Sequence, residues 1–401
     1  MGKITLEQAA QWCGGTVAEK YRNVTFLGAN NDTRKLQEGQ LFVALQGARD
    51  GHDFIPAALE KGAAAVLCTH CDGDFPAIVV PDTRIALGDI ARQERLRIGM
   101  QVVGVTGSVG KSTTKEMIAA VLESAYRVSK TPVNHNNDIG MPMAILAMPE
   151  DTEIAVLEMG MNHFREIAYL TAIAKPDVAV IINIGTMHIE HLGSREGILQ
   201  AKLEILEGME PGKAVILNGD DGLLWNLRSR PEINAVYFGA QNVESHICAQ
   251  NVEEEPGKLS FTVANGASSY RGKLPLEGQH FVLDALAAIS VGIQLNVSEE
   301  NICNSLAAFQ NMEGHQQIFG AKGFTVIQDC YNAGPESMAA ALAVLGNRTG
   351  RKIAVLGDML ELGSRATSEH YKVGRLAAEK ADMVFAYGPH SLKVKDGALT
   401  G

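Results

Sequence analysis

The chain lacks long hydrophobic runs, an excess of basic residues and a second close pair of cysteines. No stretch of about 18 apolar residues occurs, and the first residues have no apolar core of a secretory signal. We therefore expect a cytoplasmic protein without membrane insertion. The 35 Lys and Arg residues are outnumbered by 46 Asp and Glu, for a formal net charge of −11. This balance argues against nucleic acid as a partner, because neutralising phosphates requires clustered basic residues.

The six cysteines include one pair with redox or zinc spacing, Cys68 and Cys71. A zinc site would need a second close pair, so we expect ordinary reduced thiols. What remains is typical of a globular α/β protein, with 46% apolar and 20% charged residues. Because 401 residues are too many for one ordinary core, the length suggests two or three domains. The pattern along the chain predicts three, at residues 1–99, 100–311 and 312–401. We expect a monomer.

The strongest motif is Gly-Val-Thr-Gly-Ser-Val-Gly-Lys-Ser-Thr at residues 104–113. It follows an apolar strand at 100–105 and precedes a helical segment at 114–123, which is the arrangement of a phosphate-binding loop. Backbone N–H groups of such a loop contact polyphosphate oxygens. The motif predicts an ATP site in which Lys111 reaches the β- and γ-phosphates and Ser112 offers its hydroxyl to Mg²⁺. The predicted nucleotide-binding residues are Gly107, Ser108, Val109, Gly110, Lys111, Ser112 and Thr113.

Two further apolar strands of the central domain end in polar residues. The strand at 153–157 ends at Glu158, and the strand at 177–182 is followed by His188. In parallel sheets ligands bind outside the carboxyl ends of the strands, so we expect both side chains to converge with the loop. A carboxylate in that place is the usual holder of Mg²⁺. From the residues alone, either side chain could equally be a solvated strand end, and Lys202 is interpreted as a solvated helical lysine.

The flanking domains read as smaller α/β units. The first has short strands at 41–45, 64–67 and 77–80, with turn-like residues from Asp32 to Arg34. Within the central domain, residues 235–275 predict an antiparallel extension, followed by a helix. The last domain has strands at 324–327, 352–356 and 383–386 that alternate with helices, a βαβαβ pattern typical of a Rossmann-like sheet. We expect this domain to be incomplete, because the chain ends at Gly401, where another strand and helix would be needed.

Several stretches together resemble the Mur ligase family over essentially the whole chain. They are residues 32–35 with 39–45, 105–112, 134–140, 158–162, 183–188 with 201–204, 329–338 and 357–363. The resemblance implies three α/β domains: a UDP-sugar-binding first domain, an ATP-binding central domain with a mostly parallel sheet, and a Rossmann-like third domain. It also implies an ATP-dependent acid–amino-acid ligase of peptidoglycan precursor synthesis. That ligase joins D-alanyl-D-alanine to UDP-N-acetylmuramoyl-tripeptide through an acyl phosphate, giving ADP and phosphate.

The resemblance also implies roles for individual residues. The catalytic group is Lys111, Glu158, His188 and Lys202. Two Mg²⁺ ions would be held by Ser112, Glu158, His188 and Lys202. Lys202 would carry CO₂ as a carbamate, which converts a cation into the oxygen ligand that a hard metal prefers. Substrate contacts fall on Thr33, Arg34, Asn134 and Asn137, and further nucleotide contacts on His280, Asp329 and Tyr331.

Some positions depart from the family pattern. Phe281 and Asp284 stand where asparagines are usual, and His315 stands where an arginine usually meets the phosphates. Replacing arginine by histidine loses a permanent charge and a bidentate fork. These departures motivate an alternative, a nucleotide-binding paralogue without ligase activity. The relative that adds the third peptide residue is disfavoured by the stretches 188–194 and 331–333.

Overall fold

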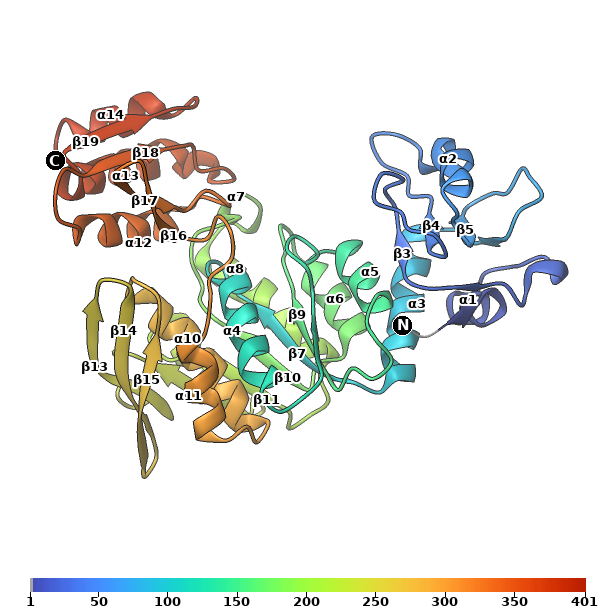
Figure 1. The fold of residues 1–401 in the computed structure, drawn as a ribbon, viewed down its shortest axis with the longest axis horizontal. Helices are drawn as coiled ribbons and strands as arrows, with labels where there is room; N and C mark the ends of the chain where they lie inside the picture. The colour runs from blue at the N-terminus through green and yellow to red at the C-terminus, as the bar shows by residue number, and fades with distance from the viewer. Residues whose placement is uncertain (1–2) are drawn as a thin grey trace.

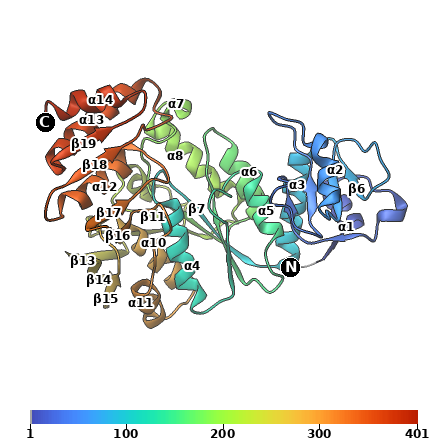
Figure 2. The same ribbon diagram turned by 45° about the horizontal axis from the view of Figure 1, so that its top comes forward.

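The computed structural model describes residues 3–401. The N-terminal unit and the C-terminal unit lie at opposite ends of the molecule, with a large central sheet between them (Figure 1). The same arrangement is seen after rotation, where the C-terminal unit lies beside α10 (His280–Gln294) and α12 (Pro335–Gly346) belongs to it (Figure 2). No described helix has the length and apolar content that crossing a bilayer would require.

The N-terminal unit is built on a four-stranded parallel sheet. Its strands, in spatial order, are β3 (Ala29–Asn30), β4 (Leu41–Val43), β5 (Ala65–Cys68) and β6 (Ala77–Val79). The three strands expected from the apolar runs are therefore confirmed. The helices of this unit are α1 (Leu6–Cys13), α2 (Ile55–Glu60) and α3 (Thr83–Ile98). A short antiparallel pair, β1 (Ile4–Thr5) with β2 (Thr25–Phe26), accompanies them.

The central sheet has nine strands in the order β15-β14-β13-β12-β11-β10-β7-β9-β8. They are β7 (Gln101–Thr106), β8 (Val128–Lys130), β9 (Ile154–Glu158), β10 (Val178–Ile181), β11 (Ala214–Asn218), β12 (Ala235–Gly239), β13 (Ile247–Glu255), β14 (Lys258–Asn265) and β15 (Ser268–Leu274). The expected antiparallel extension is confirmed for β13 to β15. It was wrong for β12, which pairs in parallel with both neighbours.

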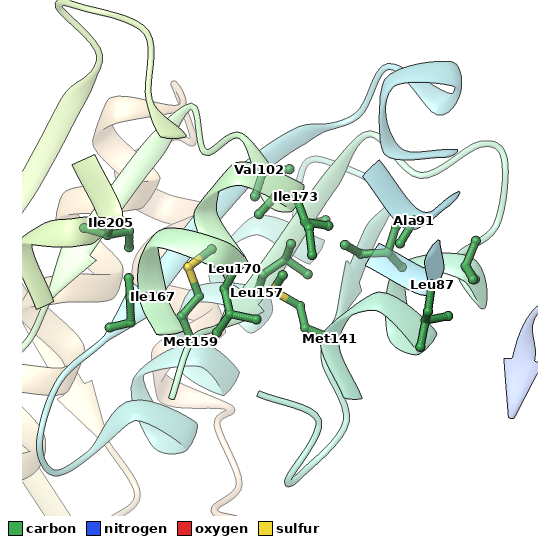
Figure 3. Packing of buried hydrophobic residues seen from close by; sticks show 14 of the residues in the cluster. Leu87, Ala91, Val102, Met141, Leu157, Met159, Ile167, Leu170, Ile173 and Ile205 are labelled. Atoms are coloured by element: carbon green, nitrogen blue, oxygen red, sulfur yellow. The ribbon is translucent and has the colours of Figure 1, made fainter. Parts of the chain in front are cut away.

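Helices cover both faces of this sheet, because alternate residues of each strand point to opposite sides. On one face Val103 and Val105 pack with α4 (Lys111–Glu123), α10 and α11 (Glu299–Ala307) in one hydrophobic cluster. On the other face Val102 and Leu157 belong to a cluster that also contains residues of the N-terminal unit. Figure 3 shows this second cluster, in which α3 supplies Leu87 and Ala91. The N-terminal unit thus shares a buried core with the central sheet.

The remaining helices of the central region are short, and α5 and α6 supply residues to the cluster on the second face of the sheet. They are α5 (Gly140–Leu146), α6 (Glu166–Ala174), α7 (Ile189–Leu192), α8 (Arg195–Leu203) and α9 (Gly222–Trp225). Two of them begin at a side-chain cap: the Ser194 side chain accepts a hydrogen bond from the Gly197 N–H at α8, and Asp221 caps α9. Such caps satisfy backbone donors that would otherwise lack a partner.

The C-terminal unit contains two separate pairs of strands. β16 (Gln317–Ala321) and β17 (Phe324–Gln328) form an antiparallel hairpin, whereas β18 (Ile353–Leu356) and β19 (Met383–Ala386) are parallel. The prediction that residues 324–327 join the other strands in one βαβαβ sheet was therefore wrong in its pairing. Lys322 and Gly323 both have positive φ, 48° and 85°, and such a two-residue turn closes a hairpin. The other helices are α13 (Ala366–Lys380) and α14 (Ser391–Ala398).

Candidate active site

The phosphate-binding loop joins β7 to the first residue of α4. Gly110 has φ of 85°, and a Cβ on it would lie 2.8 Å from Asp284 Oδ1, so only glycine fits there. Asn183, at the end of β10, ties the loop down: its Oδ1 accepts hydrogen bonds from the N–H groups of Ser108 (2.9 Å) and Val109 (3.0 Å). There is also little space for a side chain at Gly107, because a Cβ there would lie 3.1 Å from Ile182. The loop is held in shape by the neighbouring strand.

Glu158 is fixed by hydrogen bonds to both of its carboxylate oxygens. Ser112 Oγ donates to Oε2 at 2.8 Å, and Asn136 Nδ2 donates to Oε1 at 2.9 Å. The fully buried Lys115 places its Nζ 3.9 Å from Oε2. Glu158 itself is 2% exposed, so the interpretation of a solvated strand end is wrong. A carboxylate in such a network is held in one orientation beside the loop.

Lys111 begins α4 and donates from Nζ to the carbonyl oxygen of Ser108 at 3.2 Å. Burial lowers the pKa of Lys111, while the nearby charge of Glu158 acts in the opposite direction. A polyphosphate at this loop would stabilise the charged amine, because an opposite charge nearby favours the ionised form. The position of Lys111 is thus suited to a strongly negative ligand.

Lys202 lies in α8, and its side chain reaches the phosphate-binding loop. Its side chain is 2% exposed, and Nζ donates to the carbonyl oxygen of Gly107 at 2.8 Å. Burial, helped by the charge of Lys111, puts the pKa of Lys202 well below its usual value. The interpretation of Lys202 as a solvated helical lysine is therefore wrong. A neutral buried amine is a nucleophile, unlike an ordinary surface lysine.

His188 has φ of 62° and lies directly before α7. Its Nδ1 faces the carboxylate of Glu361 from the C-terminal unit. Burial lowers the pKa of His188, and the charge of Glu361 opposes this effect. His188 is thus half-buried at the junction of two units. Among residues 3–401, no three His, Cys, Asp or Glu side chains form a group that could hold a metal ion.

A cleft of about 470 Å³ lies at the carboxyl ends of the central strands, beneath the C-terminal unit. The predicted site residues that line it are Ser108, Val109, Gly110, Lys111, Ser112, Thr113, Asn134, Asn137, Glu158, His188, His280, Asp329 and Tyr331. Gly107, in the loop, and Lys202 do not line the cleft, and Lys202 Nζ donates to the Gly107 carbonyl oxygen. Burial lowers the pKa of His280 to about 4, so its ring is neutral at pH 7.

Thr33 and Arg34 do not line the cleft. They follow β3 in the N-terminal unit, where the Arg34 guanidinium pairs with Asp32 at 2.8 Å. The Arg34 side chain is 86% exposed and thus accessible to a ligand. Asn137 does line the cleft, but its Oδ1 accepts from the Gly140 N–H at 2.8 Å at the start of α5.

The C-terminal unit contributes further groups, of which Glu336 and Arg348 were not singled out from the sequence. Glu336 accepts hydrogen bonds from the N–H and the hydroxyl of Thr186, both at 2.9 Å. Arg348 pairs with Glu277 at 2.5 Å. The Tyr331 hydroxyl donates to Asn134, and the rings of His315 and Tyr331 stack at 4.3 Å. Asn136, Asn183 and Glu336 lie within the stretches quoted above, but no spacing indicates which side chains of a stretch face the cleft.

Comparisons with known proteins agree along the whole chain. Family models match residues 23–95 ("Mur ligase family, catalytic domain"), 105–292 ("Mur ligase middle domain") and 315–399 ("Mur ligase, glutamate ligase domain"). The chain is 40% identical to UDP-N-acetylmuramoyl-tripeptide–D-alanyl-D-alanine ligase of Bacillus subtilis, over 100% of this chain and 88% of that protein. It is 34% identical to the ligase of the same name in Escherichia coli, over 100% and 89%.

Solved structures agree with the sequence relatives. A crystal structure of MurF from Acinetobacter baumannii superposes with a TM-score of 0.93 at 32% identity, covering 99% of this chain and 88% of that one. MurF ligase from Thermotoga maritima, in complex with ADP, matches with a TM-score of 0.82 at 31% identity, covering 92% and 86%. These matches also bear out the three-domain α/β architecture with a mostly parallel central sheet. The chain belongs to the Mur ligase family.

Proposed function

We propose that this chain is an ATP-dependent ligase that joins D-alanyl-D-alanine to UDP-N-acetylmuramoyl-tripeptide in peptidoglycan precursor synthesis. The observation that carries the proposal is the hydrogen-bonded set of Ser112, Glu158 and Asn136 beside a phosphate-binding loop that holds Lys111. Such a set serves phosphoryl transfer. The relatives from Bacillus subtilis and Escherichia coli carry this activity in their names. The match to this chain covers at least 88% of the length of each of them.

The reaction consists of two transfers. The terminal carboxylate of the tripeptide attacks the γ-phosphorus of ATP, so a C–O–P bond forms and the bond to ADP breaks. The amine of D-alanyl-D-alanine then attacks the acyl carbon, forming the amide and releasing phosphate and a proton. Lys111 and the N–H groups of the loop stabilise the negative charge that develops on the transferred phosphoryl group. The cleft under the C-terminal unit excludes water that would hydrolyse the acyl phosphate.

The residues of the cleft fit the magnesium ions that the family implies. Ser112 and Glu158 offer a hydroxyl and a carboxylate within 2.8 Å of each other, and Mg²⁺ prefers such oxygen ligands. We propose that they hold one ion, and that Glu158, His188 and a carbamylated Lys202 hold a second. When bound, Mg²⁺ neutralises charge on the phosphate oxygens.

The carbamate on Lys202 is supported by its environment. The pKa of Lys202 is well below its usual value, because the amine is buried near Lys111. A neutral amine attacks the carbon of CO₂ and loses a proton, which yields a carbamate anion. Its hydrogen bond to the Gly107 carbonyl points Nζ at the phosphate-binding loop. The new oxygens would therefore form close to the proposed metal ligands.

The proposal extends to the other predicted contacts. Thr33 and Arg34 would bind the UDP end of the substrate in the N-terminal domain (1–99), and Asn134 and Asn137 its peptide part. His280, Asp329 and Tyr331 would contact the nucleotide between the central domain (100–311) and the C-terminal domain (312–401). Because ATP is its substrate, we propose that the chain acts in the cytoplasm, as a monomer.

The test is an assay of phosphate release with the full chain, ATP, Mg²⁺, UDP-N-acetylmuramoyl-tripeptide and D-alanyl-D-alanine. Each component is omitted in turn. We expect release only when both the tripeptide and the dipeptide are present, and an amide product by mass spectrometry. ATP binding without turnover would instead identify a nucleotide-binding paralogue, and release with a free amino acid in place of the dipeptide would identify another member of the family.

A further inference from the structure

Asp284 is a buried acidic residue that touches the phosphate-binding loop and has no role in the reaction described above. It lies in α10 and is 5% exposed. Its Oδ1 accepts a hydrogen bond from Thr114 Oγ1 at 2.8 Å. The same oxygen lies 2.8 Å from the place where a Cβ on Gly110 would be. The carboxyl group is therefore packed directly against the backbone that is proposed to hold the phosphates.

No cation neutralises this carboxyl group. Asp284 forms no ion pair with any residue between 3 and 401. Its second oxygen, Oδ2, has no hydrogen-bond partner among those residues, and the side chain lines the cleft. The other titratable groups that line the cleft, from α4, α10, the strand ends and the C-terminal unit, are Lys111, Glu158, Glu166, His188, His280, His315, Asp329, Tyr331 and Glu336.

Burial raises the pKa of Asp284 to about 7, and the hydrogen bond from Thr114 acts in the opposite direction. None of the charged groups of the cleft contributes to this shift. A carboxyl group that is protonated has an O–H donor and one remaining acceptor oxygen, as a side-chain amide has both a donor and an acceptor. An ionised carboxylate in the same place would repel a polyphosphate, because like charges at short distance disfavour each other.

We propose that Asp284 is a nucleotide-binding residue that works in its protonated form, donating a hydrogen bond from Oδ2 toward the nucleotide at the phosphate-binding loop. When it ionises, the same residue weakens nucleotide binding. This inference rests on the proposed use of ATP. It assigns a function to a position where the chain departs from its family, since an acid that keeps its proton substitutes for the amide of asparagine.

The expected pH dependence follows from the direction of the shift. The protonated form of Asp284 predominates below about pH 7, and the carboxylate predominates above it. If only the protonated form binds nucleotide well, the dissociation constant rises about tenfold between about pH 6 and about pH 8. Nucleotide binding at a pH near 8 must then be accompanied by uptake of a proton from the buffer.

The experiment measures ADP binding to the full chain by isothermal titration calorimetry at constant Mg²⁺, from about pH 6 to about pH 8.5. The unchanged protein is compared with Asp284→Asn and, as a matched control, with Glu336→Gln, another carboxylate of the cleft, which accepts hydrogen bonds from Thr186. ADP avoids turnover, and its own ionisation is common to all three proteins. We expect the pH slope of the unchanged protein and of Glu336→Gln to be lost in Asp284→Asn.

Parallel slopes in the unchanged protein and Asp284→Asn would overturn the inference. If Asp284→Asn does not fold, as judged by circular dichroism, proton uptake by the unchanged protein decides instead. It is measured near pH 8 in two buffers of different ionisation enthalpy. We expect roughly one proton taken up for each ADP, and no uptake would overturn the inference. If the chain does not use ATP, ADP binds at no pH, whereas loss of ligation alone is seen only in the phosphate-release assay and leaves the pH slope of ADP binding in place.

Discussion

The wall of the cleft formed by the central sheet is held by buried hydrogen bonds, whereas the wall formed by the C-terminal unit is held mainly by exposed polar contacts. Ser112 and Glu158, which are 7% and 2% exposed, bond to each other at 2.8 Å. Thr186 and Glu336 bond at the surface, and Glu361, which faces His188, has a side chain that is 42% exposed. Segments with few buried contacts open at lower free-energy cost than the core.

This difference between the two walls suggests the manner in which ATP and the larger substrate enter the cleft. The wall that is proposed to hold the phosphates is already fixed by its own hydrogen bonds, so we expect little ordering when ATP binds. We expect the wall contributed by the C-terminal unit to separate and re-form, which would admit a large substrate and later exclude water. The partly buried pair of Arg348 and Glu277, at 2.5 Å, also joins the C-terminal unit to the central domain.

The largest effect is expected for Lys111→Ala, which removes the cation of the prebuilt wall. We expect kcat/KM for phosphate release to fall by about 10³-fold or more, since a group that stabilises transition-state charge is lost. Lys213→Ala is the matched control, because that lysine is 42% exposed and pairs with Asp177 at 3.0 Å, far along the chain from the loop. A loss of less than about tenfold for Lys111→Ala would contradict this assignment.

Lys202→Ala tests the buried lysine that bonds to the phosphate-binding loop. We expect a loss of turnover of about 10²-fold that added bicarbonate does not restore, because no amine remains to form the carbamate. In the unchanged protein, ¹³C-labelled bicarbonate should give a carbamate signal by nuclear magnetic resonance that is missing in Lys202→Ala. Near-normal turnover of the variant would rule out the carbamate.

Leu157→Ala tests how much a buried strand position beneath the first wall contributes to stability. Leu157 is 0% exposed in β9, directly before Glu158, so its truncation leaves a cavity. We expect the free energy of unfolding to fall by about 2–5 kcal/mol, measured in urea. Val355→Ala in β18 is the matched change at an exposed position, 67% exposed, and should cost at most about 0.5 kcal/mol. Equal costs would contradict the difference in burial between these two strand positions.

Glu361→Gln, in the movable wall, should have the smallest effect. It removes a contact of a partly exposed carboxylate, so stability should change by less than about 1 kcal/mol. Because the charge of Glu361 raises the pKa of His188 against the effect of burial, the variant should titrate His188 at lower pH. Nuclear magnetic resonance titration of the His188 ring measures this shift, and an upward shift would contradict the contact.

Much of the scaffold was predictable, because its signals are local. The apolar run at 100–105, the glycine-lysine loop and the helix after it follow one another without interruption, and the structure has them in that order. The hairpin of β16 and β17 was missed, although Lys322-Gly323 is a turn signal. The apolar pattern of residues 324–327 favoured a buried strand of a larger sheet, and periodicity alone does not choose a strand's partner.

The sequence by itself determined that a strand, a phosphate-binding loop and a helix follow one another. It could do so because turn geometry and apolar periodicity depend on residues that are close together in the chain. The environments of Lys202 and Asp284 were decided only by the tertiary structure. Lys202 meets Gly107 across 95 residues, and Asp284 meets Thr114 across 170. Burial is a property of what packs against a side chain, so the lowered pKa of one and the raised pKa of the other exist only once distant segments have folded together.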